Sequence, residues 1–449
     1  MLHSCRSSVT STLRKQLRAS SWSKKTLKQQ ADSEIIWEYA SEKTKRVERV
    51  YVWGYASTGA LGVKKHVDPE KKGSPRRMQL IPYRLKDFEA KNDKVEKIAC
   101  GIGFSLFACK TAKNITEIYG CGINTDSQLG YHPSSNCKDS LDYVLEPRKV
   151  NIPSSLLSED SKIVSMDCGR AHSVIATDSS VLSLGNNSYG QLGRQPVEGE
   201  IYKSSLKVHK IELDETVKQV VCGMDQTLLL TTSGKVYACG LGADGQTGLG
   251  HYNVTGTPML VKGDIENEHI VQISCIADTC LAVSDKGDVF GWGNCEYNQF
   301  YSIQKDILQL NVPRRLPLDM GKVIETATGG STCAALNDKG EIFVWGFGIL
   351  GLGPKLDNCC QPTKIPEVLF GKNDFNPDCE VVSLKSGLNH FAVLNNNGDL
   401  YTWGRNKFAV LGLGHKLDQF FPFKVLLPAE AVDVCCGIDH MIVRSKSYA

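Results

Sequence analysis

The chain has 449 residues, of which 41% are apolar, and its 52 Lys and Arg against 49 Asp and Glu give a formal net charge of +3. This apolar content is ample for a large core, and the length would allow two or three ordinary domains. Because no apolar run approaches about eighteen residues, the sequence predicts no membrane-spanning helix.

The first 31 residues form a basic leader. They hold seven Lys or Arg and seven Ser, no central apolar block interrupts them, and the first acidic residue is Asp32. This composition is typical of a mitochondrial transit peptide and unlike a secretory signal. A basic tail that binds nucleic acid, or a nuclear signal, is the alternative. We therefore expect a disordered transit peptide over 1–31 and a linker over 32–48. The expected location is mitochondrial, in the matrix or associated with the inner membrane.

Outside the leader the charges nearly cancel. Without its seven basic residues, 45 basic residues face 49 acidic ones. The body is therefore not expected to bind polyanions through its bulk charge.

The body begins at Arg49 with RVYVWG, a β-branched and aromatic run typical of a strand. An insertion follows between Gly62 and Val95. Over 64–86 it has eight basic residues and two acids, and its glycine and three prolines predict a loop. The loop is a candidate surface for RNA phosphate or an acidic protein, and a solvated excursion is the alternative. The basic candidates are Lys64, Lys65, Lys71, Lys72, Arg76, Arg77, Arg84 and Lys86.

A repeat of about fifty-odd residues organises the body. A W-G position recurs as Trp53-Gly54, Cys121-Gly122, Leu184-Gly185, Cys239-Gly240, Trp292-Gly293, Trp345-Gly346 and Trp403-Gly404. A C-G position alternates with it as Cys100-Gly101, Cys168-Gly169, Cys222-Gly223, Cys275-Ile276, Gly329-Gly330, Ser386-Gly387 and Cys436-Gly437. Seven repeated units replace the multi-domain interpretation.

Each unit contains one clear hairpin. In one of them LLLT is followed by the turn Thr232-Ser233-Gly234 and then by KVYAC. Three-residue turns that end in glycine suit a hairpin whose last turn residue has positive φ. No helical periodicity of useful length lies between the hairpins, so the units are predicted to be all-β.

Two glycine runs fit G-x-G-x-x-G, the spacing of dinucleotide-binding turns. They are Gly240 to Gly245 and Gly346 to Gly351, and each comes after a predicted strand. The segments beyond these strands are too rich in glycine to start a helix, and the motif needs that helix to hold a pyrophosphate. The glycines are therefore predicted to be turn and bulge positions of the repeat.

Seventeen cysteines raise the question of disulfides or zinc. No C-x-x-C occurs, and five cysteines share the C-G position of the repeat. Recurrence at a repeat position is typical of a small, buried apolar side chain. We expect neither a metal site nor a structural disulfide.

Near the C-terminus the segment from Leu352 to Pro377 departs from the repeat. It contains Phe370, Phe375 and four prolines, which predict an irregular loop able to present aromatic side chains to a partner.

The two chain ends are complementary. The last unit has Cys436-Gly437 and the strand MIVRS but no W-G strand, and the strand that ends at Trp53-Gly54 has no upstream partner. Joining the two half-units would close a ring and remove unpaired edges. The sequence therefore predicts an all-β fold over 49–449, a seven-bladed β-propeller closed by its N-terminal strand.

The repeat resembles that of a known family. CGRAHS at 168–173 with LGNNSYGQLG at 184–193 is similar to the repeat of the regulator of chromosome condensation (RCC1) propellers. The resemblance runs from about 49 to 445 and is weakest after Trp292, where both final glycines are missing. With its basic leader, the chain resembles a mitochondrial member of that family.

The resemblance implies a site. In the founding member, Asp and His after C-G are among the residues that affect nucleotide exchange on its GTPase. The corresponding rim candidates here are His172, Asp225, Asp278, Asn389, His390, Asp439 and His440. Structural roles are the alternative, because such histidines can bond the next blade and such aspartates often close turns. The positions Gly103-Phe104 and Thr332-Cys333 break the pattern.

The sequence has no catalytic constellation or nucleotide-binding motif, so we expect neither an enzyme nor a cofactor. The resemblance favours guanine nucleotide exchange on a mitochondrial GTPase. The alternative is a scaffold for mitochondrial ribosomal RNA or ribosome assembly that uses the basic insertion. Peripheral membrane association is compatible with both.

Overall fold

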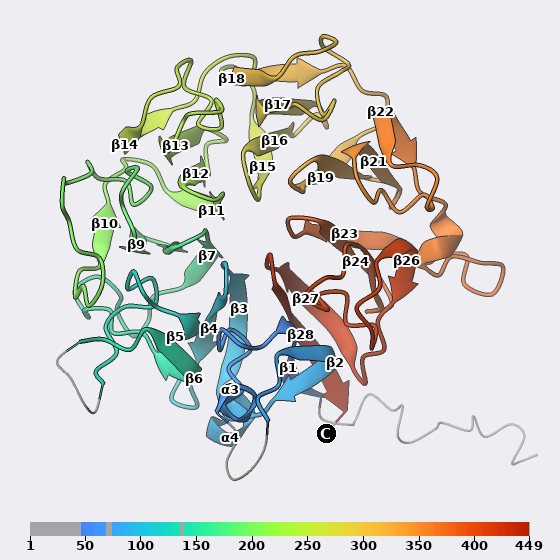
Figure 1. The fold of residues 1–449 in the computed structure, drawn as a ribbon. Helices are drawn as coiled ribbons and strands as arrows, with labels where there is room; N and C mark the ends of the chain where they lie inside the picture. The colour runs from blue at the N-terminus through green and yellow to red at the C-terminus, as the bar shows by residue number, and fades with distance from the viewer. Residues whose placement is uncertain (1–45, 69–73, 135–138, 449) are drawn as a thin grey trace, which may run out of the picture. The chain divides into compact units, whose positions relative to one another are not determined.

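The computed structural model describes residues 46–68, 74–134 and 139–448, and its compact body is Glu48–Ser447. In these residues, seven four-stranded antiparallel sheets follow one another around a central axis (Figure 1). This arrangement confirms the prediction of an all-β, seven-bladed propeller. The predicted leader over 1–31 and most of the linker over 32–48 lie outside the described residues.

The blades are numbered by their first strand, and each runs from the central axis outwards. Blade 1 contains β3 (Lys94–Cys100), β4 (Phe104–Lys110), β5 (Thr116–Ile123) and β6 (Tyr143–Lys149). Blade 2 contains β7 (Ile163–Cys168), β8 (His172–Thr177), β9 (Val181–Gly185) and β10 (His209–Ile211). Blade 3 contains β11 (Val217–Cys222), β12 (Gln226–Thr231), β13 (Val236–Gly240) and β14 (Thr255–Leu260).

The next three blades repeat the same order. Blade 4 contains β15 (Ile270–Cys275), β16 (Thr279–Ser284), β17 (Val289–Asn294) and β18 (Gln309–Leu316). Blade 5 contains β19 (Val323–Thr328), β20 (Thr332–Asn337), β21 (Ile342–Phe347) and β22 (Asn358–Lys364). Blade 6 contains β23 (Val381–Ser386), β24 (His390–Asn395), β25 (Leu400–Gly404) and β26 (Gln419–Lys424).

Blade 7 joins the two ends of the chain. Its inner strands are β27 (Glu430–Cys436) and β28 (His440–Tyr448), and its outer strands are β1 (Arg46–Tyr55) and β2 (Met78–Leu85), in the order β2-β1-β28-β27. The backbone N–H of Tyr55 donates to the carbonyl of Asp439 at 2.7 Å. The predicted closure is therefore confirmed, and it pairs the strand of Trp53 with the strand of Met441.

The core lies between the blades. The second strands of blades 2 to 6 are buried at every position, because a neighbouring blade covers each face of the sheet. Their sequences are accordingly runs of small and branched apolar residues, such as QTLLLT and TCLAVS. Trp53, Trp292, Trp345 and Trp403 are fully buried and extend this core outwards along the third strands.

The outermost strands share a proline. In every blade except the second, the pairing of the third and fourth strands shifts opposite the W-G tryptophan or its cysteine equivalent, and a proline ends the shifted stretch. The prolines are Pro82, Pro147, Pro258, Pro313, Pro362 and Pro422. Because proline offers no backbone donor, it weakens the exposed edge as a template for another strand.

The basic insertion is more ordered than predicted. It contains the short helices α3 (Lys64–Val67) and α4 (Asp87–Lys91) and the strand β2 between them. The prediction of a loop is therefore wrong for 78–85. An outermost strand tolerates Pro82 and the basic Arg84, because its free edge needs neither donors nor apolar side chains.

The segment from Leu352 to Pro377 needs a similar correction. It contains the whole of β22 and the 3₁₀ helix η2 (Glu367–Phe370), so the prediction of an irregular loop is wrong for these parts. Phe370 is buried against Tyr401 and Trp403, and only Phe375 of the two predicted aromatics is presented to solvent, with 99% exposure.

The first glycine run agrees with the structural interpretation. The strand β14, and no helix, comes after Gly240 to Gly245. Gly240 has φ of +115°, and a Cβ atom there would lie 2.5 Å from the carbonyl oxygen of Asp225. Glycine is required because the second strand of the blade passes too close for a side chain.

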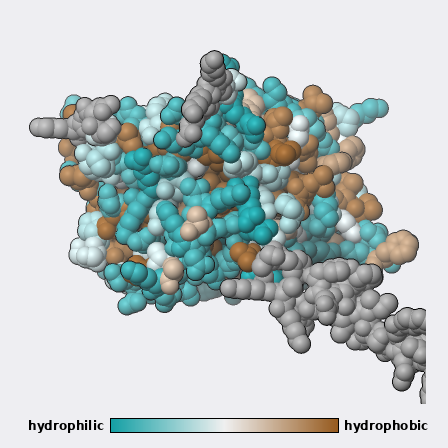
Figure 2. Space-filling view, turned by 90° about the horizontal axis from the view of Figure 1, so that it is seen from below, coloured by the Kyte–Doolittle hydropathy of each residue, from teal (hydrophilic) through white to brown (hydrophobic). Residues whose placement is uncertain are grey.

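The up-and-down order of the strands gives the propeller two unlike faces. We call the end that carries the loops between first and second strands and between third and fourth strands the loop face. The hairpin face carries the turns between second and third strands and the connections between blades. Figure 2 shows the outer wall on the side of blade 7, which is largely hydrophilic, with hydrophobic residues gathered to the right, the side of β26. Phe420, Phe421 and Phe423 of β26 are 37%, 44% and 58% exposed.

Candidate interaction face

The residue that opens each second strand forms a buried ring beneath the loop face. It is fully or almost fully buried in every blade, with exposures between 0% and 6%. In chain order the ring contains Phe104, His172, Gln226, Thr279, Thr332, His390 and His440.

Two of these histidines bond the following blade. Nε2 of His172 lies 3.2 Å from Oγ1 of Thr227, and Nε2 of His440 lies 2.8 Å from Oγ of Ser105. The hydroxyls complete the link, because Thr227 and Ser105 donate to loop carbonyls of the blade before their own, at 2.7 Å each. The histidine of one blade and the Ser or Thr of the next blade thus form a link between blades, which we call the latch.

Burial also fixes the charge of His172 and His390. It lowers the pKa of His172 to about 3 and that of His390 to about 4. Both imidazoles are neutral at pH 7 and have no exposed edge. The prediction that His172, His390 and His440 face a partner is corrected, because their side chains lie inside the sheets and position the loops above them.

The aspartates of the predicted ring lie closer to the surface. Asp225 accepts two bonds from Arg170, with Nη2 to Oδ2 at 2.7 Å and Nε to Oδ1 at 3.2 Å. Its side chain is 9% exposed and that of Arg170 is 53% exposed. Burial raises the pKa of Asp225, and Arg170 opposes that shift.

Asp278, Asp439 and Asn389 complete the set. Asp278 accepts from Nε2 of Gln246 at 3.0 Å, and burial, followed by the charge of Asp244, raises its pKa. Asp439 accepts from the backbone N–H of Gly103 at 3.3 Å, so it ties blade 7 to blade 1. Asn389 is exposed. The structure thus brings all four non-histidine candidates to the loop face, from blades 3, 4, 6 and 7.

The register predicted for blade 5 is off by one residue. Thr332 pairs with Gly346 as His172 pairs with Gly185, so Ser331-Thr332 occupies the position assigned to Thr332-Cys333. Its C-G equivalent is Thr328-Gly329. Because two glycines follow Thr328, the sequence offers two equally good alignments, and the strand pairing decides between them.

The basic residues of the insertion do not form one patch. Among those the structure describes, Lys64, Lys65, Arg84 and Lys86 surround a cavity of about 370 Å³ on the outer side of the ring. Three acids share this cavity, namely Asp68, Asp87 and Glu146, and Arg84 pairs with Glu89.

Arg76 and Arg77 are exposed elsewhere, on the loop between β1 and β2. The carbonyl of Arg77 accepts from the N–H of Ala56, next to the end of β1. They therefore belong to the loop face. Lys71 and Lys72 lie outside the described residues.

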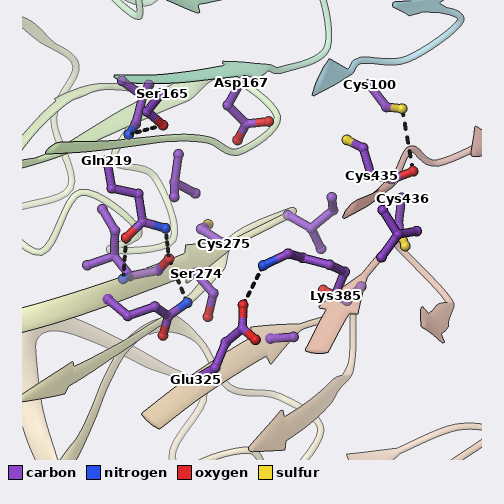
Figure 3. Close-up of a pocket in the computed structure, with 18 of the residues that line it drawn as sticks. Cys100, Ser165, Asp167, Gln219, Ser274, Cys275, Glu325, Lys385, Cys435 and Cys436 are labelled. Atoms are coloured by element: carbon purple, nitrogen blue, oxygen red, sulfur yellow. Dashed lines mark hydrogen bonds and ion pairs between the residues drawn. The ribbon is translucent and has the colours of Figure 1, made fainter. Parts of the chain in front are cut away.

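The central channel holds charges that the sequence analysis missed. Residues of all seven described first strands line a cavity of about 290 Å³ (Figure 3). Asp167 accepts from the N–H of Cys222 at 2.8 Å, and burial raises its pKa to about 7. Burial lowers the pKa of Lys385, but its ion pair with Glu325 outweighs that effect and raises it. For Asp167 the available signal was a charged residue between two apolar neighbours, Met166 and Cys168, in a predicted strand.

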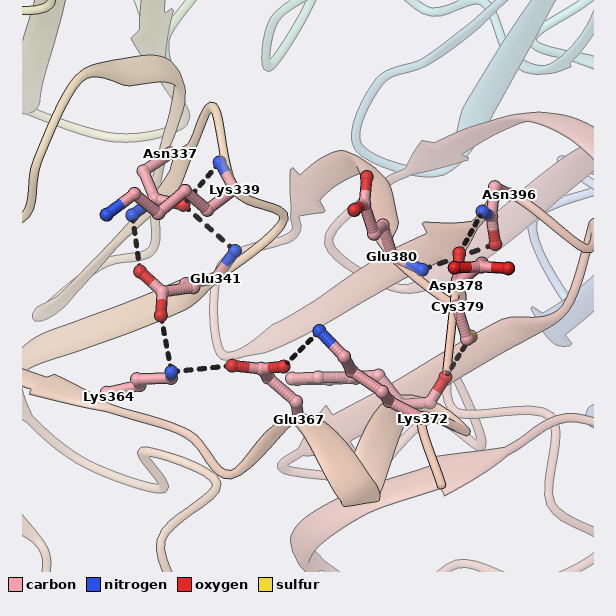
Figure 4. A network of polar contacts seen from close by, with 11 residues as sticks. Asn337, Lys339, Glu341, Lys364, Glu367, Lys372, Asp378, Cys379, Glu380 and Asn396 are labelled. Atoms are coloured by element: carbon pink, nitrogen blue, oxygen red, sulfur yellow. Dashed lines mark hydrogen bonds and ion pairs between the residues drawn. The ribbon is translucent and has the colours of Figure 1, made fainter. Parts of the chain in front are cut away.

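The hairpin face carries a chain of ion pairs between blades 5 and 6 (Figure 4). Lys364 bridges Glu341 and Glu367, and Lys372 reaches Glu367 at 2.6 Å. These groups are partly exposed, so each pair contributes at most about 1 kcal/mol. Their role is local order around η2.

The described cysteines are thiols rather than disulfides. All fifteen of them are unpaired, and the thiols of Cys275 and Cys280 lie 3.1 Å apart. No cluster of three metal-ligating side chains occurs in 46–68, 74–134 or 139–448. In the same ranges, no helix has the length and apolarity to cross a membrane.

The fold and the repeated latch define a β-propeller built from C-G-x-x-H-S units. The family model "RCC1-like domain" matches residues 117–448, and "Regulator of chromosome condensation (RCC1) repeat" matches 48–108. The chain therefore belongs to the RCC1-repeat propeller family, as the resemblance predicted.

Individual relatives agree with this assignment. A mouse protein named RCC1-like G exchanging factor-like protein is 47% identical over 431 residues, which cover 93% of this chain and 92% of the relative. The crystal structure of human WBSCR16 is 47% identical, with a TM-score of 0.82 over 90% of this chain and 100% of that one. Prp20p from Saccharomyces cerevisiae, at 19% identity and a TM-score of 0.70 over 91% of this chain and 93% of that one, shares the fold.

Proposed function

We propose that this protein is a guanine nucleotide exchange factor for a mitochondrial GTPase and that its loop face binds the GTPase. The observation that carries the proposal is the convergence of Arg170, Asp225, Asp278, Asn389 and Asp439 on one face of a rigid ring. The names of the mouse and human relatives, both 47% identical, support exchange. The basic, Ser-rich leader supports a mitochondrial location.

An exchange factor needs complementarity rather than covalent chemistry. If the loop face binds the nucleotide-free GTPase more tightly than the loaded form, it must weaken nucleotide binding by the same factor. The buried latches suit this role, because they hold loops of neighbouring blades at fixed separations. Arg170 and Asn389 are the exposed members of the set and are the expected contacts.

Release of a fluorescent GDP analogue tests the proposal. Purified GTPases of the matrix and inner membrane, including ribosome-assembly and fusion types, are loaded and mixed with the full chain. We expect faster release from one of them and at least about a tenfold smaller acceleration with Arg170→Ala combined with Asn389→Ala. Phe375→Ala on the hairpin face should leave the rate unchanged.

Two results would contradict the proposal in different ways. Failure to accelerate release from any of these GTPases would refute exchange itself. Undiminished acceleration by the double variant would leave exchange intact and remove its assignment to the loop face.

A second function is favoured by the exposed pair Arg76 and Arg77. We propose as the alternative a scaffold in mitochondrial ribosome or ribosomal RNA assembly that contacts RNA phosphate through this pair. Arg76→Gln with Arg77→Gln should weaken association with mitochondrial ribosomal particles and reduce the salt slope by about two. Lys113→Gln with Lys339→Gln, two exposed lysines of the hairpin face, is the matched control. Equal losses in both double variants would refute a site at Arg76 and Arg77.

A further inference from the structure

Blade 5 departs from the repeat in the loop between its third and fourth strands. In the other blades, the position of the final glycine of the repeat, which is Gly193 in LGNNSYGQLG, lies eight residues after the W-G glycine, as Gly412 lies after Gly404. In blade 5 the same interval is five residues, from Gly346 to Gly351. In blade 6, Asn406 stabilises the loop, because its Oδ1 accepts from the backbone N–H of Leu411 at 3.0 Å. Blade 5 has Gly348 at that position.

The shorter loop leaves a buried donor without a partner. Trp53, Trp292 and Trp345 each donate their indole N–H to a loop carbonyl of the preceding blade, at 2.6 to 2.9 Å. The equivalent acceptor for Trp403 would be Ile349. In the described residues, Nε1 of Trp403 is buried and has no partner. The loop of blade 5 is therefore truncated at the point where the other loops close over the next blade.

A pocket of about 340 Å³ opens at this truncation, on the loop face between blades 5 and 6. Ile349 and Leu388 line it together with the aromatic rings of Tyr297 and Phe347. These two rings are nearly parallel, at 16°, with their centres 6.0 Å apart, and each residue is about 40% exposed. The pocket therefore offers an apolar wall that is already ordered.

The pocket has a positively charged side chain and no negatively charged one among its lining residues. Arg405 and Asn389 are exposed at its edge, and none of its ten lining residues is acidic. No carboxylate of the described residues is within ion-pair distance of Arg405, in contrast to Arg170, which Asp225 neutralises. A guanidinium with free donors matches a carboxylate in a bidentate geometry.

We infer that this pocket binds a partner's peptide segment in which a carboxylate stands next to a large apolar side chain. The volume fits one or two side chains, the aromatic wall accepts the apolar one, and Arg405 with Asn389 accepts the acid. A nucleic acid strand is disfavoured, because its successive phosphates would find one cation in the pocket. The inference goes beyond nucleotide exchange and does not depend on it.

Ligand-observed NMR with the full chain tests this inference. The probes are acetyl-leucyl-glutamate amide, its glutamine analogue without the charge, its seryl analogue without the apolar side chain, and the dinucleotide UpU. We expect the first to bind, and each of the others to bind at least about tenfold more weakly. Arg405→Gln and, separately, Phe347→Ser should lower the affinity for the first probe by a similar factor.

Lys407→Gln is the matched control, because Lys407 is an exposed cation of the same loop that does not line the pocket. It should bind the first probe as the unmodified chain does. The inference is overturned if acetyl-leucyl-glutamate amide does not bind, if Arg405→Gln binds it unchanged, or if UpU binds more tightly.

Discussion

Two tryptophans at the same position of the repeat allow a controlled measurement of a hydrogen bond between blades. Trp53 and Trp403 are both fully buried and both lie against a positive-φ glycine of the preceding blade, Gly412 and Gly351. Their indole N–H groups differ in one hydrogen bond. Nε1 of Trp53 donates to the carbonyl of Val410 at 2.6 Å, whereas Nε1 of Trp403 has no partner among the described residues.

Replacing each by phenylalanine removes the same atoms. Both variants lose apolar contact and gain a small cavity, and these costs should be similar because both side chains are fully buried and phenylalanine keeps a ring against Phe370 and Phe391, the aromatic neighbours of Trp403. Trp53→Phe also leaves the Val410 carbonyl without its donor, which costs about 1–3 kcal/mol more. Trp403→Phe removes a buried donor that was already unsatisfied, so it has no such cost. Trp53→Phe should therefore destabilise the chain by about 1–3 kcal/mol more than Trp403→Phe.

Urea unfolding followed by far-UV circular dichroism measures the difference. The comparison is valid where the two variants have the same dependence on urea, because the slope reports the surface exposed on unfolding. Equal free energies of unfolding, or a greater loss for Trp403→Phe, would refute the reasoning. Either result would mean that the loop of blade 5 satisfies its tryptophan as well as the other loops do.

Three further predictions concern buried groups. Burial lowers the pKa of His172 to about 3, so the unfolded chain binds the proton more readily and the free energy of unfolding decreases as pH falls below about 6.5. The variant His172→Gln introduces the residue type that blade 3 has at Gln226. It should reduce this loss when urea unfolding at pH 5 is compared with pH 7.5. Burial raises the pKa of Asp167 to about 7, so the folded state binds the proton more readily and stability falls as pH rises from about 4 to 7. Asp167→Asn should flatten that fall in thermal unfolding between pH 5 and 8. An unchanged dependence of the melting temperature on pH would contradict this prediction. Gly240→Ala places a Cβ atom 2.5 Å from the carbonyl of Asp225 at φ of +115°, so it should lower the free energy of unfolding by more than about 1 kcal/mol, and a neutral effect in urea would disprove the close approach.

The ring and its closure could be predicted from the sequence because both depend on recurrence along the chain. Trp53 without an upstream partner and Met441 without a downstream one are visible as an incomplete unit at each end. The pairing of β1 with β28 follows from that deficit alone. A closed ring has one way to satisfy both edges, so no three-dimensional information was needed.

The histidines could not be placed in the same way. A recurring His marks a position in each unit, but recurrence does not say whether the side chain points to solvent or into the next blade. His172 and His440 are buried because a hydroxyl of the following blade, on Thr227 and Ser105, lies within reach. That relation joins residues 55 or more positions apart, so the sequence leaves the outward and the inward orientation as two open alternatives. The same limit explains β2, whose pairing with β1 outweighs its unfavourable composition.

The residues that recur along the repeat and those that vary between blades have different roles, and this difference limits which side chains a partner can contact. The recurring residues hold one blade to the next, and their polar atoms face inwards. They are His172 with its neighbours and the W-G tryptophans. A partner can therefore contact only the exposed side chains that lie above these residues and differ from blade to blade. On the loop face those residues include Arg170, Asn389 and Arg405. They come from blades 2 and 6, so a partner that contacts them all must span the mouth of the central channel. One small peptide in the pocket of blade 5 cannot do so, whereas a folded domain such as a GTPase can. Competition between the two would therefore be partial, and a saturating peptide should reduce, without abolishing, binding of the larger partner.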